Sequence, residues 1–187
     1  MRSPLLMGRN DTGLLVIDLQ EKLLGKIPES ASLLRRASLL ISGAQILGLP
    51  VLATEQYPKG LGPTHPELRG RLEAPLEKLD FSCAALGAVT AFFKERKIPK
   101  ILLTGVETHV CVLQTALDLA HQGFQVYGAV DSMGSRSVLD HKWGLKRMEK
   151  SGVTLTTVET ALFEWTQRAG TPEFKEISRL IKDQNPA

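Results

Sequence analysis

Short apolar runs alternate along the chain with longer stretches in which apolar residues recur every three or four positions. A continuous apolar run after a turn residue is typical of a strand buried on both faces of a parallel sheet. The periodic stretches are typical of amphipathic helices. We therefore predict strands at residues 13–17, 49–54, 101–104, 124–130 and 153–158, and helices at residues 33–47, 84–97, 110–121, 138–150, 162–168 and 173–183.

The predicted strands and helices follow one another with short joints at glycine or proline, an order that favours right-handed crossovers. This order predicts a three-layer, doubly wound α/β fold with helices on both faces of a mainly parallel sheet. We expect about six strands in the order 3-2-1-4-5-6, one of them a short strand that carries Lys78 together with Phe81 and Ser82. A chain of 187 residues has the length of about one domain, so residues 1–187 are expected to form a single domain.

The segment of residues 55–75 interrupts this alternation, because it is rich in proline and glycine. A long loop without secondary structure inside a compact domain is usually functional. We interpret it as a structureless wall or lid over a site. The final predicted helix carries one apolar face, which would suit either the sheet or a partner subunit, and both alternatives stay open. That face comprises Phe174, Ile177, Leu180 and Ile181.

Composition and charge exclude several classes of protein. The 23 Lys and Arg residues are scattered and nearly balanced by 20 Asp and Glu, for a net charge of +3, so nucleic acid is not an expected partner. No apolar run approaches the ~20 residues that cross a bilayer, and residues 1–9 are short and polar for a signal peptide. We expect a cytoplasmic protein, without membrane contact, whose two cysteines stay thiols.

Candidate chemistry follows the predicted strands, because ligands of open parallel sheets bind beyond the carboxyl ends of the strands. Asp18 ends the first strand, residues 105–111 follow the strand that begins at Ile101, and Asp131 follows the strand that begins at Phe124. Lys78 comes just after the proline-rich segment. These groups are expected to converge on one pocket.

Cys111 carries the strongest local argument for a nucleophile. Thr108 is a suitable N-cap, which would put Cys111 in the first turn of a helix, where the helix dipole lowers a thiol pKa. The alternative is that Cys111 packs as a small buried hydrophobic residue. Cys83 lies among small residues at a predicted helix start, and we interpret it as a core residue.

Two charged residues would complement such a thiol, although each has a simpler alternative. Asp18 is costly in an apolar strand unless it is paired, but it could merely cap the following turn. Lys78 could pair with Asp18 and stabilise a thiolate, or it could be a solvated surface lysine. Asp131 and Arg136 are expected to form an ion pair or cap at the crevice edge.

The sequence contains no motif for a metal or nucleotide. Its four histidines form no HExxH, and no CxxC or Asp-x-His occurs, so a metal site is not expected. The patterns GxGxxG after the first strand, GxxxxGK[ST] and GxSxG are also missing, which argues against dinucleotide, P-loop and serine-hydrolase functions.

Three separated motifs occur in order along the chain: Val16-Ile-Asp-Leu-Gln20, Lys78-Leu-Asp-Phe-Ser82 and Gly105-Val-Glu-Thr-His-Val-Cys-Val112, the last followed by a predicted helix. Together they resemble the motifs of the isochorismatase-like cysteine hydrolases. The match runs in order from about residue 12 to residue 182. Within that superfamily, residues 54–63 and 172–177 are most similar to the isochorismatase-domain-containing group.

The resemblance implies a catalytic triad and a small-molecule substrate. The family's Asp, Lys and nucleophilic Cys match Asp18, Lys78 and Cys111. The family's non-proline cis peptide would fall between Val106 and Glu107 and aim the Glu107 N–H, beside that of Cys111, into an oxyanion hole. Gln20 and Tyr57 match pocket-lining positions, and family members are commonly homo-oligomers. No cofactor is implied.

One departure bears on the substrate. Nicotinamidases of this superfamily bind a metal through an Asp-x-His pair and further histidines after the second strand, whereas this chain offers Glu55, Gln56, Tyr57 and a lone His65. We therefore predict metal-independent hydrolysis of a small amide through a thioester. The alternatives are vinyl-ether hydrolysis of an isochorismate-like molecule with Asp18 as general acid, and a binding scaffold with an idle triad.

Overall fold

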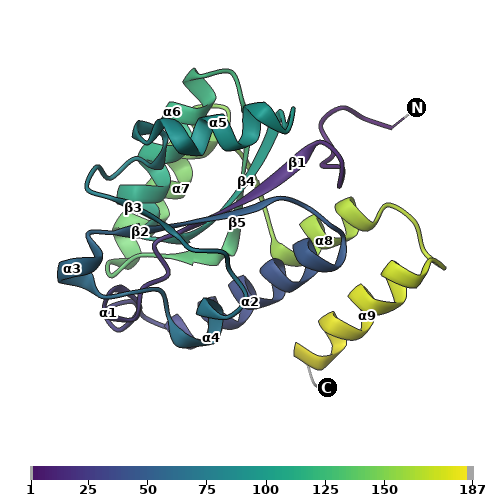
Figure 1. Ribbon diagram of the computed structural model, residues 1–187, viewed down its shortest axis with the longest axis horizontal. Helices are drawn as coiled ribbons and strands as arrows, with labels where there is room; N and C mark the ends of the chain where they lie inside the picture. Colours follow the sequence, from purple (N-terminus) through teal and green to yellow (C-terminus); the bar gives the residue numbers. More distant parts are fainter. Residues whose placement is uncertain (1, 185–187) are drawn as a thin grey trace.

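The computed structural model describes residues 2–184, and six strands of this part of the chain form one sheet between two layers of helices (Figure 1). Every neighbouring pair of strands is parallel, in the order β3-β2-β1-β4-β5-β6. The predicted fold class and strand order are confirmed. The strands are β1 (Thr12–Ile17), β2 (Val51–Gln56), β3 (Leu76–Lys78), β4 (Lys100–Val106), β5 (Gln125–Gly134) and β6 (Thr154–Thr156).

The helices cover both faces of the sheet (Figure 1). One layer contains α2 (Ser30–Ile46), α8 (Val158–Thr166) and α9 (Pro172–Gln184). The other contains the 3₁₀ turn η1 (Cys83–Ala85) and helices α5 (Gly87–Glu95), α6 (Leu113–His121) and α7 (Val138–Lys150). The π-helical turn η2 (Thr108–Val112) leads into α6, and the short helices α1 (Glu21–Leu24), α3 (Pro58–Leu61) and α4 (Pro66–Arg69) lie in loops that follow β1 and β2.

Strand β1 shows why the sequences of the central strands are continuously apolar. Leu14 and Val16 belong to the hydrophobic core beneath α2, α8 and α9, whereas Leu15 and Ile17 belong to the core on the opposite face. Successive side chains of a strand point to opposite faces, so a central strand between two helical layers must be apolar at every position.

The apolar face of α9 packs within the chain. Ile177 is fully buried and Ile181 is 9% exposed, both in the core that α2 and α8 complete. The helix thus packs mainly on α2 and α8 and not directly on the sheet, and cover by a partner subunit stays a prediction.

The segment of residues 55–75 is not structureless, so that prediction is wrong. Its first two residues end β2, and short helices begin at Pro58 and Pro66. Proline is favoured at the first helical position, where its fixed φ fits and its missing N–H is not needed. An antiparallel bridge between Gln20 and Thr64 also ties the segment to the loop after β1.

Some predicted boundaries also differ from the structure. Strand β6 ends at Thr156, and α8 begins at Val158 because the Thr157 hydroxyl caps it by accepting a hydrogen bond from the Thr160 N–H. Strand β5 continues to Gly134, past a register shift against β4. Phe81 and Ser82, expected on the strand of Lys78, lie beyond its end.

Gly105 is required where β1 and β4 pair near their carboxyl ends. Its φ is +122°, and a Cβ atom there would lie 2.0 Å from the Ile17 carbonyl oxygen. Gly48 has a φ of +72° but open space around the position of a Cβ. An added side chain would therefore cause both backbone strain and a steric clash at Gly105, but backbone strain alone at Gly48.

We predict that Gly105→Ala destabilises the fold by at least about 3 kcal/mol, because strain and collision add. Gly48→Ala should cost only about 1–2 kcal/mol, because it brings strain alone. Thermal melting followed by circular dichroism measures both. Equal losses of melting temperature would contradict the assigned contact with Ile17.

Candidate active site

A buried ion pair lies where β1 and β3 end. The Lys78 Nζ is 2.7 Å from the Asp18 Oδ2, and both side chains are fully excluded from solvent. The second carboxylate oxygen of Asp18 accepts a hydrogen bond of 2.8 Å from the Thr54 hydroxyl on β2. Adjacent parallel strands thus supply the carboxylate, the hydroxyl and the ammonium, because their carboxyl ends lie at one edge of the sheet.

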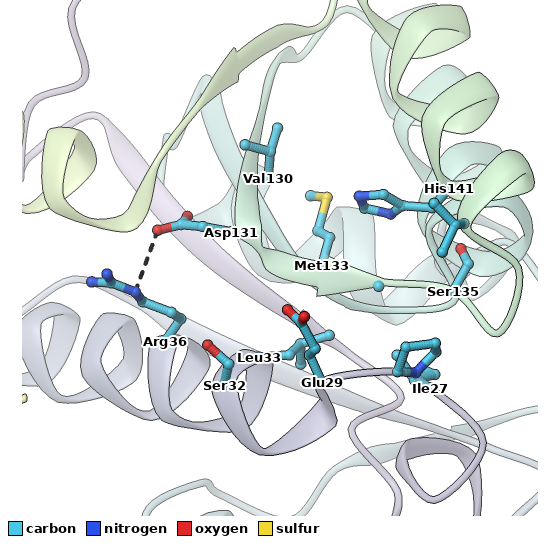
Figure 2. Close-up of a pocket in the computed structure, with 13 residues that line it drawn as sticks. Ile27, Glu29, Ser32, Leu33, Arg36, Val130, Asp131, Met133, Ser135 and His141 are labelled. Carbon is cyan, nitrogen blue, oxygen red and sulfur yellow. Dashed lines mark ion pairs between the residues drawn. The ribbon is translucent and has the colours of Figure 1, made fainter.

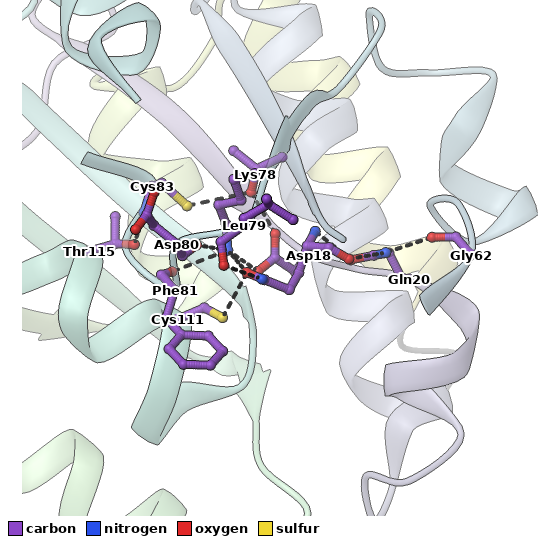
Figure 3. A network of polar contacts seen from close by, with 12 residues as sticks. Asp18, Gln20, Gly62, Lys78, Leu79, Asp80, Phe81, Cys83, Cys111 and Thr115 are labelled. Atoms are coloured by element: carbon purple, nitrogen blue, oxygen red, sulfur yellow. Dashed lines mark hydrogen bonds and ion pairs between the residues drawn. The ribbon is translucent and has the colours of Figure 1, made fainter. Parts of the chain in front are cut away.

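The ammonium of Lys78 is surrounded by oxygen atoms. Besides Asp18, it donates to the Gln56 Oε1 at 2.6 Å, and to the carbonyl oxygens of Phe81 at 3.1 Å and Asp80 at 3.3 Å (Figure 3). Burial is the largest single effect and lowers the pKa of Lys78, but the charge of Asp18, its hydrogen bond and the two nearby thiols together outweigh burial, so the pKa is raised. Lys78 therefore stays a cation, and its simpler alternative as a solvated surface lysine is wrong.

The carboxyl group of Asp18 is a stronger base than a solvated one. Burial raises its pKa, and this effect exceeds the opposing effects of Lys78, Thr54 and the hydrogen bond from the Cys111 thiol. A carboxylate with a raised pKa accepts a proton more readily than an ordinary aspartate.

Cys111 lies beside this ion pair but does not have the predicted low pKa. Its side chain is buried in η2, with the residue 5% exposed, and its sulfur is 3.9 Å from the Gln56 Oε1. Burial and the charge of Asp18 raise the pKa of the thiol to about 12, against the smaller effect of Lys78. The resting group is a neutral thiol, because desolvation outweighs the helix terminus and the nearby ammonium.

Thr108 is not the N-cap that the sequence suggested. The residue before the turn is Glu107, and it makes no side-chain capping hydrogen bond. The Thr108 hydroxyl instead lies 2.9 Å from the Nδ1 of His141 on α7. The turn that carries Cys111 is thus fixed from the side by α7.

The peptide bond between Val106 and Glu107, where the resemblance implies a cis bond, is cis in the structure. The Glu107 side chain is nearly buried and pairs with the Arg136 Nε at 2.9 Å. The predicted pairing of Asp131 with Arg136 is therefore wrong. Asp131 faces Arg36 at 3.8 Å and accepts a hydrogen bond from the N–H of Val158, because β5 carries it toward α2 and α8.

Tyr57 begins the loop that follows β2, and Gln20 bonds to the two ends of its first turn. Gln20 is fully buried, and its amide bonds to the backbone of Gln56 and to the Gly62 carbonyl. The Tyr57 N–H donates to the Lys78 carbonyl at 2.8 Å, and the residue is 49% exposed. Contact of either residue with a substrate stays a prediction.

Sequence reasoning did not find Thr54 or Gln56 as site residues, and it treated Cys83 only as core. Cys83 is fully buried, as expected, but its sulfur lies 3.5 Å from the Thr54 hydroxyl that bonds Asp18. The sequence signal for all three was weak, because an uncharged polar residue or a buried thiol is recognised as part of a site only once its partners are known.

A separate cavity of about 560 Å³ opens beyond the carboxyl end of β5, between the starts of α2 and α7 (Figure 2). Two of its lining residues touch the turn before Cys111: the Ser135 hydroxyl is 2.9 Å from the Nδ1 of His109, and His141 contacts Thr108. Asp18, Lys78 and Cys111 do not line it. The cavity thus lies next to η2, on the side where Ser135 and His141 contact it.

Within residues 2–184, no three His, Cys, Asp or Glu side chains form a group that could hold a metal ion. The Glu55 carboxylate instead accepts hydrogen bonds from the N–H and hydroxyl of Thr64, at 2.6 and 2.7 Å. No helix in that part of the chain is long and apolar enough to cross a membrane.

Comparison with known proteins agrees with this architecture. The family model of the isochorismatase domain matches residues 12–160. Isochorismatase domain-containing protein 2A of Mus musculus is 41% identical over 92% of this chain and 84% of its own length. Isochorismatase domain-containing protein 1 of Salmo salar is 40% identical over 90% of this chain, which spans 60% of that relative. A solved structure named MAR1 ribonuclease, from Caenorhabditis elegans, has a TM-score of 0.89 and 36% identity, with 97% and 95% of the two chains covered.

Fold and comparisons together define a doubly wound α/β hydrolase, with a buried Asp–Lys pair and a cysteine at the carboxyl edge of its sheet. The chain belongs to the isochorismatase family.

We predict that iodoacetamide alkylates Cys111 before Cys83. The pKa of Cys83 is raised by burial to about 11, below that of Cys111, so thiolate content alone would favour Cys83. Access favours Cys111, which is 5% exposed against 0% for Cys83. The rate at Cys111 should rise about tenfold per pH unit from pH 7 to 10, since the thiolate fraction does so below its pKa. Peptide mapping after brief alkylation measures both sites, and a rate at Cys111 that levels off near pH 7 would contradict the raised pKa.

Proposed function

We propose that the chain hydrolyses a small amide through a thioester on Cys111. The observation that carries the proposal is that the buried thiol of Cys111 contacts the Asp18–Lys78 ion pair. A nucleophile within reach of a base, which is itself held by a third group, is the arrangement that covalent catalysis requires.

In the proposed reaction, Asp18 takes the thiol proton as the sulfur attacks the substrate carbonyl. The raised pKa of Asp18 favours this transfer, and Lys78 stabilises the negative charge as it moves from carboxylate to sulfur. Asp18 then protonates the leaving amine, and the C–N bond breaks to leave a thioester. Asp18 next activates a water, which releases the acid and restores the thiol.

The oxygen of the attacked carbonyl needs donors as its charge develops. We assign this role to the backbone N–H groups of Glu107, which directly precedes η2, and of Cys111, which lies within η2. The loss of one such donor typically costs ~100 to 1000-fold in rate. The ion pair of Glu107 with Arg136 supports this segment from outside.

A second candidate is vinyl-ether hydrolysis, in which Asp18 protonates the substrate and no bond to sulfur forms. The raised pKa of Asp18 favours it, because a buried carboxyl group holds a proton at higher pH. An idle binding scaffold is the third alternative.

We predict that Cys111→Ala lowers amide turnover by several orders of magnitude and removes the acyl-enzyme from intact-mass spectra, because the bond-forming atom is gone. Ammonia release from a panel of small amides is the measurement, with Cys83→Ala as the matched control for loss of a buried thiol. Retention of more than about a tenth of the turnover, less than ~1.4 kcal/mol of lost transition-state stabilisation, would refute the thioester mechanism.

The same panel separates the alternatives. A vinyl-ether hydrolase would keep much of its rate in Cys111→Ala and lose it in Asp18→Asn, and a scaffold would turn over nothing. RNA belongs in the panel because one similar structure is named a ribonuclease. Cleavage of RNA without amide hydrolysis would contradict the proposal.

The pH profile of turnover should reflect the raised pKa of Asp18. The base must be ionised, so kcat/KM should fall as the pH drops through the pKa of Asp18, and this acid limb should lie above the ordinary value of 3.8. Initial rates between pH 3 and 9 locate the limb. Full activity down to pH 3.8 would show that Asp18 is not the base.

A further inference from the structure

Gln56 occupies the centre of the site without a role in the proposed triad. It is the last residue of β2 and is 8% exposed. Its Oε1 accepts the 2.6 Å hydrogen bond from the Lys78 ammonium, and its Nε2 donates to the Leu79 carbonyl at 2.7 Å. One neutral side chain thus bridges the catalytic lysine and the loop beyond it.

The orientation of this amide is determined by its partners. A flipped amide would set its NH₂ group against the Lys78 ammonium and its oxygen against the Leu79 carbonyl, and both contacts would be repulsive. The oxygen of Gln56 must therefore face Lys78. That same oxygen is 3.9 Å from the Cys111 sulfur, so it contacts both the cation and the thiol.

The backbone of Gln56 is held as firmly as its side chain. The Gln20 Oε1 accepts from the Gln56 N–H at 2.8 Å, and the Gln20 Nε2 donates to the Gln56 carbonyl at 3.0 Å. Gln20 is fully buried, so these two bonds replace those that water would make. Gln20 and Gln56 therefore connect the loop after β1 to the lysine and the cysteine.

We propose that Gln56 is a positioning residue for the nucleophile. Its oxygen keeps the Lys78 ammonium against Asp18 and holds the neutral thiol of Cys111 next to the carboxylate that will take its proton. The role rests on the proposed function, but the reactivity of the thiol tests it without a substrate.

Gln56→Leu removes the acceptor and should lower kcat about 10 to 100-fold, as for the loss of a hydrogen bond to a charged group, with KM changed less than about threefold. The matched control is Glu55→Gln, which alters a buried neighbour that bonds Thr64 and should keep the wild-type kcat. A kcat of Gln56→Leu within about threefold of the wild-type value would overturn the proposal.

Gln56→Glu distinguishes positioning from a general loosening of the site. A carboxylate at residue 56 keeps an acceptor for Lys78 but adds negative charge beside Asp18 and the sulfur. It should slow alkylation of Cys111 at pH 8–9 at least threefold and move the acid limb of kcat/KM to higher pH. A merely loosened site would expose the thiol and accelerate alkylation.

Alkylation of Gln56→Glu at the wild-type rate or faster would therefore overturn the inference. If the wild-type chain hydrolyses no amide, the proposed function fails, whereas the alkylation rates still decide the role of Gln56. Gln56→Met, which is unbranched and lacks an amide, replaces Gln56→Leu if circular dichroism shows that the latter is unfolded.

Discussion

The burial of the Asp18–Lys78 ion pair constrains the whole carboxyl edge of the sheet. Two charges removed from water are stable only if other polar groups replace the lost hydration. Thr54 and Gln56 of β2 supply two of these groups, and the carbonyls of Asp80 and Phe81 supply the others. The loops after β2 and β3 therefore take conformations that serve the ion pair.

The protonation state of Cys111 follows from the same burial. The helix terminus and Lys78 favour a thiolate, but the loss of water and the charge of Asp18 oppose it more strongly. The resting site therefore carries its negative charge on the carboxylate of Asp18 and not on the sulfur of Cys111. A neutral thiol of this kind reacts only slowly with oxidants and alkylating agents.

The sequence predicted the fold and the convergence of strand ends well, because both follow from local pattern and from the geometry of parallel sheets. Burial depth is not local, so the pKa of Cys111 was predicted with the wrong sign. The partner of Arg136 could not be deduced either, since Glu107 directly follows β4 whereas Asp131 lies inside β5, a strand that continues past the end predicted for it. Gln56 escaped notice because an uncharged amide has no chemical signature until its neighbours are known.

Lys78 lies on β3, a very short strand of the sheet. Strand β3 has three residues, lies at the edge of the sheet and pairs with β2 alone. Edge segments with few hydrogen bonds open locally at a much smaller free energy than the core. A brief detachment of β3 would take the ammonium away from Asp18 while β1, β4 and β5 stay paired, so the buried ion pair is a less stable unit than the fold around it.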